Sequence, residues 1–158
     1  MGKLAVIILF SILIVGCSSV NSSNATPAIA AIGGSWNLVL TSTQSGYPPA
    51  GTFGFGLSIA QSGSVATATQ IPLTVPTTYG LSCPDATAPV TISGLSAQQA
   101  TITIAGNTNG NSDRPEIMTD TSCAVVANLT VTGASMAGTY TFSGSSGQTT
   151  GSVAMTRQ

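Results

Sequence analysis

The sequence contains no histidine, and lysine and arginine together supply three of its 158 residues. A Ser-His-Asp triad and a Cys-His pair both need an imidazole as general base, so neither can form. Lys3 is the single lysine, so a chain processed beyond it would also lack the amine of a Ser-Lys dyad or a Schiff base. Zinc sites of cysteine and histidine are disfavoured by the missing histidine. We therefore expect no enzyme, no metal and no cofactor.

Charge of either sign is scarce, because charged residues make up 4% of the chain. Beyond Lys3 there remain four acids and two arginines, which gives a net charge of −2. Nucleic-acid binding needs clustered cations that displace counterions from phosphates, so no nucleic-acid partner is expected. Disordered chains combine low hydrophobicity with high charge. Here 42% of the residues are hydrophobic, which indicates a folded chain.

The carboxylates are the remaining candidates for site chemistry. A carboxylate pair could in principle hydrolyse glycosides, but we interpret Asp85, Asp113, Glu116 and Asp120 as surface charge on loops. Oxygen-bearing side chains alternate over 107–113 as in calcium loops. The glycine is fourth rather than sixth and no acid follows at the twelfth position, so the segment does not fit an EF-hand. Ordinary turn chemistry is the preferred interpretation.

The N-terminal stretch decides where the protein resides. Lys3 precedes an apolar run from Leu4 to Val15, which has the length of a signal-peptide core and falls short of the roughly 20 residues of a spanning helix. The ending Ile14-Val15-Gly16-Cys17 resembles the lipobox of bacterial lipoproteins. This resemblance implies a signal peptide over 1–16, cleavage before Cys17, and acylation of that cysteine with membrane-anchoring chains such as palmitate. The alternative is an ordinary secretory signal with an incidental cysteine.

The lipoprotein resemblance also implies a location. It places the protein in the bacterial cell envelope, lipid-anchored, and Ser18 in place of an aspartate favours the outer membrane; the face is left open. Residues 17–32 are rich in Ser, Asn, Thr, Ala and Pro and predict a flexible lipidated tether. The remaining residues, 33–158, are enough for one domain with a real core.

Two cysteines, Cys83 and Cys123, fall within this exported domain. A disulfide between them is the expected state in an oxidising compartment. Closing that loop would contribute about 4 kcal/mol in the chain-entropy model. Two free buried thiols are the alternative.

From Gly33 onward, apolar residues alternate with polar ones, and Gly, Ser, Asn or Pro interrupt the pattern about every ten residues. This pattern is typical of antiparallel sheets. It predicts an all-β fold, a single antiparallel up-and-down barrel of about eight strands, because closure removes exposed edges. A β-sandwich is the alternative. The predicted strands are 35–43, 52–61, 65–70, 89–93, 99–105, 124–132, 134–143 and 152–158, with a short edge strand at 115–119.

Gly34-Ser35-Trp36 at the start of the first strand and Arg157 near the end of the last resemble the calycin pattern, found in lipocalins and avidins. The resemblance implies that the first and last strands pair and that the Arg157 guanidinium packs over the Trp36 indole. Thr119-Asp120-Thr121 departs from the Thr-Asp-Tyr turn of many lipocalins. The chain also resembles uncharacterised Gly/Ser/Thr-rich bacterial lipoproteins.

Three functions remain open. The first is a membrane-anchored, non-catalytic barrel that binds a small apolar ligand or an envelope protein partner, at residues the sequence does not identify. The second is a structural surface lipoprotein with a packed barrel and no ligand. The third is an inhibitor of an exported hydrolase that presents the loop 79–89. A cavity of about 300 Å³ or more would favour a ligand. The charges around Arg114 indicate a solvated rim, with a partner-binding face or a lid as the alternative.

Overall fold

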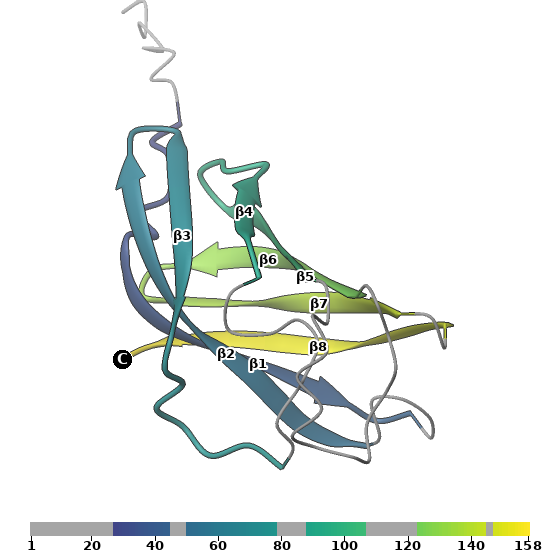
Figure 1. Ribbon diagram of the computed structural model, residues 1–158. Helices are drawn as coiled ribbons and strands as arrows, with labels where there is room; N and C mark the ends of the chain where they lie inside the picture. Colours follow the sequence, from purple (N-terminus) through teal and green to yellow (C-terminus); the bar gives the residue numbers. More distant parts are fainter. Residues whose placement is uncertain (1–26, 45–49, 79–87, 107–122, 145–146) are drawn as a thin grey trace, which may run out of the picture.

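The computed structural model describes residues 27–44, 50–78, 88–106, 123–144 and 147–158. Within these ranges the protein is all-β, with eight strands and no helix (Figure 1). The strands are β1 (Gly34–Ser42), β2 (Gly51–Ser62), β3 (Val65–Ile71), β4 (Val90–Ser93), β5 (Gln99–Gly106), β6 (Cys123–Thr132), β7 (Ser135–Gly144) and β8 (Gly147–Arg157).

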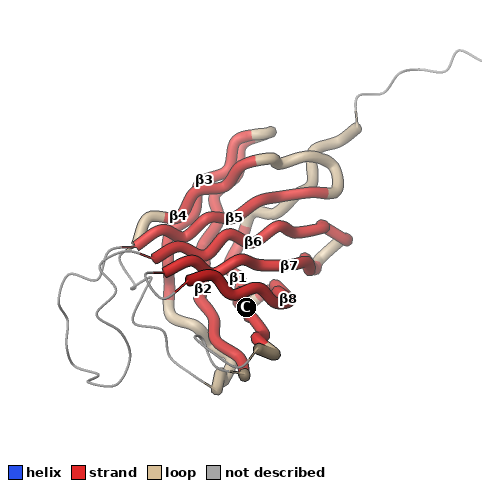
Figure 2. Tube along the Cα trace, turned by 90° about the vertical axis from the view of Figure 1, so that its right-hand side faces the viewer, coloured by secondary structure: helices blue, strands red, loops and turns tan. Residues whose placement is uncertain are grey.

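The strands form one closed barrel in which each pairs with its sequence neighbour and β1 pairs with β8. All pairs are antiparallel. Figure 2 shows the strands side by side around the barrel wall. The predicted up-and-down barrel is confirmed, and the alternative of a sandwich is not realised. The part of the chain described here contains no helix long and apolar enough to cross a membrane.

Alternation of side chains explains why one face of each strand forms the core. In β1, Trp36, Leu38 and Leu40 are fully buried, and in β6 every second residue from Cys123 to Val131 is buried. Successive strand residues point to opposite faces, so these residues fill the barrel and their neighbours face outward. The large apolar residues of β2, β7 and β8 are buried in the same way, and they are Phe53, Phe55, Leu57, Ile59, Met136, Tyr140, Phe142, Val153 and Met155.

Most predicted strand ends differ from the observed ones by one residue, but β8 begins at Gly147 rather than at 152. The segment Gly147–Gly151 has no apolar residue, so its sequence does not read as a strand. It nevertheless pairs with the end of β7, from Gly144↔Gly147 to Tyr140↔Gly151. The predicted short strand at 115–119 lies outside the described residues.

The connections between strands distinguish the two ends of the barrel. The strap end carries the N-terminal segment 27–33, which we call the strap, and the turns at 63–64, 94–98 and 133–134. The opposite end, which we call the loop end, is where the connections 43–50, 72–89, 107–122 and 145–146 leave the strands.

The contact between β3 and β4 is the weakest seam of the barrel. It has two residue pairs, Thr67↔Thr91 and Ala68↔Val90, whereas β2 and β3 share seven. In Figure 1 the β2–β3 hairpin stands clear of β4 near its tip. The strap lies at this point, because the Ala30 N–H donates to the Ser96 carbonyl in the β4–β5 turn at 3.0 Å. The strap therefore covers the strap end of the seam.

Candidate functional site

The strap end is organised around Trp36, the single tryptophan of the chain. Its ring is fully buried at the start of β1, and its Nε1–H donates to the Ile32 carbonyl at 2.8 Å. A buried indole N–H without a partner would be costly. The chain immediately before β1 therefore turns back to supply that acceptor, and Ile32 itself is fully buried.

Arg157, the last residue of β8, covers the indole. Its guanidinium carbon lies 4.4 Å from the Trp36 ring centroid, and Nη1 donates to the Gly33 carbonyl at 2.9 Å. The two residues are direct partners in the β1–β8 ladder. The expected barrel closure by Trp36 and Arg157 is confirmed by this geometry.

The glycine of the Gly-Ser-Trp motif has a steric role. Gly34 has a φ of 128°, a region that side chains with a Cβ rarely adopt. A Cβ built there would collide with the guanidinium of Arg157. The glycine, the tryptophan and the arginine of the motif thus form one structural unit.

Gln61, near the end of β2, fastens the strap and was not singled out by the sequence. Its Oε1 accepts from the N–H groups of Ile32 at 2.7 Å and Gly33 at 3.2 Å. Its Nε2 donates to the carbonyls of Ala30 at 2.8 Å and Gly63 at 2.9 Å. One amide therefore satisfies four backbone groups. A glutamine at the polar end of a strand has no sequence pattern that predicts this role.

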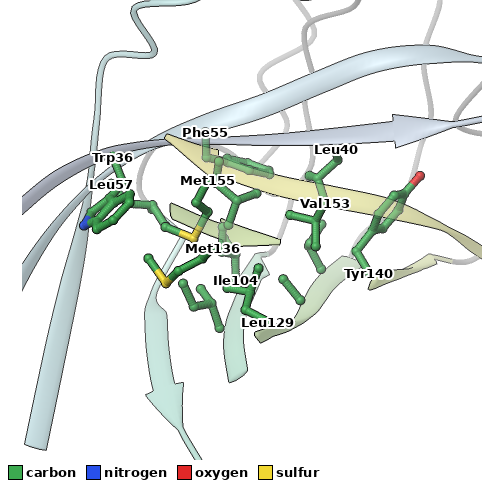
Figure 3. Packing of buried hydrophobic residues seen from close by; sticks show 14 of the residues in the cluster. Trp36, Leu40, Phe55, Leu57, Ile104, Leu129, Met136, Tyr140, Val153 and Met155 are labelled. Atoms are coloured by element: carbon green, nitrogen blue, oxygen red, sulfur yellow. The ribbon is translucent and has the colours of Figure 1, made fainter. Parts of the chain in front are cut away.

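The barrel interior is filled by large side chains (Figure 3). Phe53 and Tyr140 meet edge to face, with ring centroids 5.6 Å apart and planes at 88°. Side chains with zero exposed area touch no space that holds a water molecule, whether outside or inside the barrel. In the described interior these are Ile32, Trp36, Leu38, Leu40, Phe53, Leu57, Ile102, Ile104, Val125, Ala127 and Met155.

Tyr140 places a buried phenol hydroxyl in the part of the barrel nearer the loop end. Its side chain is 1% exposed, and the hydroxyl makes no hydrogen bond of adequate geometry. Burial raises the pKa of Tyr140, and the nearby Ser42 side chain offsets part of that rise. The neutral phenol is thus the favoured form in the folded state.

A shallow groove of about 250 Å³ lies across the β4–β5 turn, β5 and β6. Its polar lining comes from Gln99, Thr101, Asn128 and Thr130, and the Thr101 hydroxyl donates to Asn128 Oδ1 at 3.1 Å. These side chains are uncharged amides and hydroxyls. Arg157 is the one charged side chain among the described residues.

Several predicted positions lie outside the described residues. They are Cys17, Cys83, the loop 79–87, the segment 107–113 and the four acids. Cys123 opens β6 and is 5% exposed, and its disulfide with Cys83 stays a prediction. In the described ranges, no three His, Cys, Asp or Glu side chains gather where they could hold a metal ion.

Comparison of the chain with protein-family models, with curated proteins and with solved structures gives no match. The functional argument therefore depends on the residues and geometry described above.

Gln61→Leu tests the strap. The substitution leaves partly buried backbone groups of Ala30, Ile32 and Gly33 without their partner, at about 1–3 kcal/mol per unsatisfied group. Because these groups are only partly buried and water can satisfy them in part, we expect the free energy of unfolding in urea, followed by Trp36 emission, to fall by about 2–4 kcal/mol rather than by the full sum. The control Gln98→Leu, exposed in a turn at the same end, should change it by less than about 0.5 kcal/mol. Equal effects would contradict the role of Gln61.

Tyr140→Phe tests the buried phenol. Below about pH 10 the phenol is neutral in both folded and unfolded chains. Above that pH the unfolded chain loses its proton first, because the folded pKa is raised, so stability falls as pH rises. The variant should lose this component, and its stability at pH 7 should fall by less than about 1 kcal/mol, because the hydroxyl it removes is buried and makes no hydrogen bond of adequate geometry. A loss above about 1 kcal/mol at pH 7 would show that the hydroxyl is hydrogen-bonded. Urea unfolding at pH 7 and at alkaline pH measures both effects.

Proposed function

We propose that the protein is a non-catalytic lipoprotein of the bacterial cell envelope, anchored through Cys17, whose packed barrel meets an envelope partner with its outer surface. The anchor is supported by the ending Ile14-Val15-Gly16-Cys17 after a short apolar run. Several acyl chains, at about 0.8 kcal/mol per buried CH₂, hold a protein on a membrane stably.

The filled interior is the observation that carries this proposal. Ligand-binding barrels keep a cavity of roughly 300–1,000 Å³. Here the inner residues of β1, β2, β5 and β6 include many with zero exposed area. Space for a small molecule between those side chains would expose them. This supports a partner that meets the outside of the barrel, where uncharged hydroxyl and amide groups dominate among the described residues.

Three alternative functions follow from the sequence. A small apolar ligand in the barrel is the alternative suggested by its eight strands, a size that in other barrels encloses either side chains or one ligand. A purely structural lipoprotein without a partner is also compatible with a packed interior. Inhibition of an exported hydrolase depends on the loop 79–89, most of which lies outside the described residues.

Cys17→Ser tests the anchor. Without the thiol, no diacylglycerol can be attached, and the protein should move from the membrane fraction to the released fraction. Cell fractionation with a high-salt wash measures this. Ser23→Ala is the control, because it changes a tether residue outside the lipobox and should leave the membrane association intact. A Cys17→Ser protein that stays with washed membranes would contradict the anchor.

Native mass spectrometry of protein purified from its own host tests the filled barrel. We expect the mass of the acylated chain with no retained small molecule, because the described interior leaves no water-sized space beside its fully buried side chains. A stoichiometric adduct of a few hundred daltons that denaturation releases would contradict the packed barrel and favour the apolar-ligand function.

A further inference from the structure

The strap fixes where the tether joins the barrel. Ala30 is held from two sides, because its N–H donates to the Ser96 carbonyl at 3.0 Å and its carbonyl accepts from Gln61 Nε2 at 2.8 Å. Ile32, two residues later, is fully buried. The chain that comes from Cys17 therefore arrives at the strap end, beside the β2–β3 hairpin (Figure 1).

Length limits the orientations open to an anchored barrel. The ten residue steps from Cys17 to Pro27 span at most about 35 Å when fully extended. A barrel of tilted strands of this length is roughly 25 Å tall. Bringing the loop end to the membrane would force the tether to run extended along most of the barrel, at a high cost in chain entropy. The strap end needs no such extension.

The strap end also carries the exposed apolar side chains. Among the described residues, the exposed large hydrophobics are Val65, at 68%, and Ile29, at 38%. Val65 follows the β2–β3 turn, and Ile29 precedes the residue that Gln61 holds. Both therefore lie at the strap end. Exposed apolar side chains at one pole are suited to contact with the boundary between lipid headgroups and acyl chains.

The charged side chain of the described barrel lies at the same end as Val65 and Ile29. Arg157, the one charged side chain of the described barrel, lies at the strap end. An anionic lipid surface attracts this cation.

We infer that the strap end is a membrane-contacting face: Val65 and Ile29 touch the lipid surface, and the loop end points away from it. The occupant of this apolar pole is thus the lipid surface rather than a second copy of the chain. The inference rests on the proposed anchor at Cys17 and adds the orientation of the barrel and the residues in contact.

The test uses the acylated full chain in two variants, Val65→Cys and Thr150→Cys. Both positions are exposed, the first at the strap end and the second on β8 toward the loop end. Each is labelled with a thiol-reactive fluorophore, and the unsubstituted protein reports background labelling. The proteins are placed in phosphatidylethanolamine–phosphatidylglycerol vesicles that carry a quencher on the lipid headgroup. Flotation first measures how much protein is bound.

We expect the Val65 label to lose most of its emission on quencher-bearing vesicles and the Thr150 label to keep it. Bound protein with equal quenching at both positions, or stronger quenching at Thr150, would overturn the orientation while leaving the anchor in place. A protein that does not float would overturn the anchor and the orientation together. A Val65 label shielded from aqueous iodide but not quenched by the lipid would assign this pole to a second copy and overturn the inference.

Discussion

The barrel depends on the way the buried indole of Trp36 is satisfied. A sheet of eight strands is closed when its first and last strands pair, and here the ladder between β1 and β8 ends at Trp36↔Arg157. The indole N–H donates a hydrogen bond to the Ile32 carbonyl, and the Arg157 guanidinium packs over the indole face. Each partner comes from a different part of the chain, so strap, first strand and last strand are fastened at one side chain. Loss of the ring would leave a void, an unpaired carbonyl and a cation without its contact.

Low charge makes closure more important in this protein than in most β proteins. Exposed sheet edges are commonly protected by lysines and other charges, and the described barrel carries Arg157 as its one charged side chain. Its surface relies on threonine, serine, asparagine and glutamine, which hydrate well but do not repel a second strand. The complete ring of pairings removes the free edge that such a surface could not defend. The two-pair seam between β3 and β4 is the exception, and the strap covers one end of it.

The alternation of apolar and polar residues was sufficient to predict the strands of the barrel. It was insufficient to predict the hydrogen bonds that hold the strap on the barrel. Alternation located β1, β2 and β6 to within a residue, because their inner positions are apolar. The motif of Gly34, Trp36 and Arg157 anticipated the closure. The first residues of β8 and the role of Gln61 were missed for a common reason. Both depend on pairing with backbone groups, of β7 for the start of β8 and of the strap for Gln61, and a polar sequence does not encode such partners. The acids and Cys83 lie outside the described residues, so their predicted roles are not decided.

The order of the chain links the proposed anchor to the barrel. The segment that the lipobox would tether to a membrane leads directly into the residues that plug the strap end, with Ala30 held by hydrogen bonds and Ile32 buried. Tension on the tether would therefore act first on the hydrogen bonds of Gln61 and Ser96, which lie on the two sides of the weakest seam. This strap supplies the acceptor for the buried indole N–H of Trp36. Pulling it away would therefore leave that donor without a partner. The proposed attachment and the closure of the barrel thus depend on the same few residues, because the segment ahead of the first strand supplies the acceptor for the buried indole.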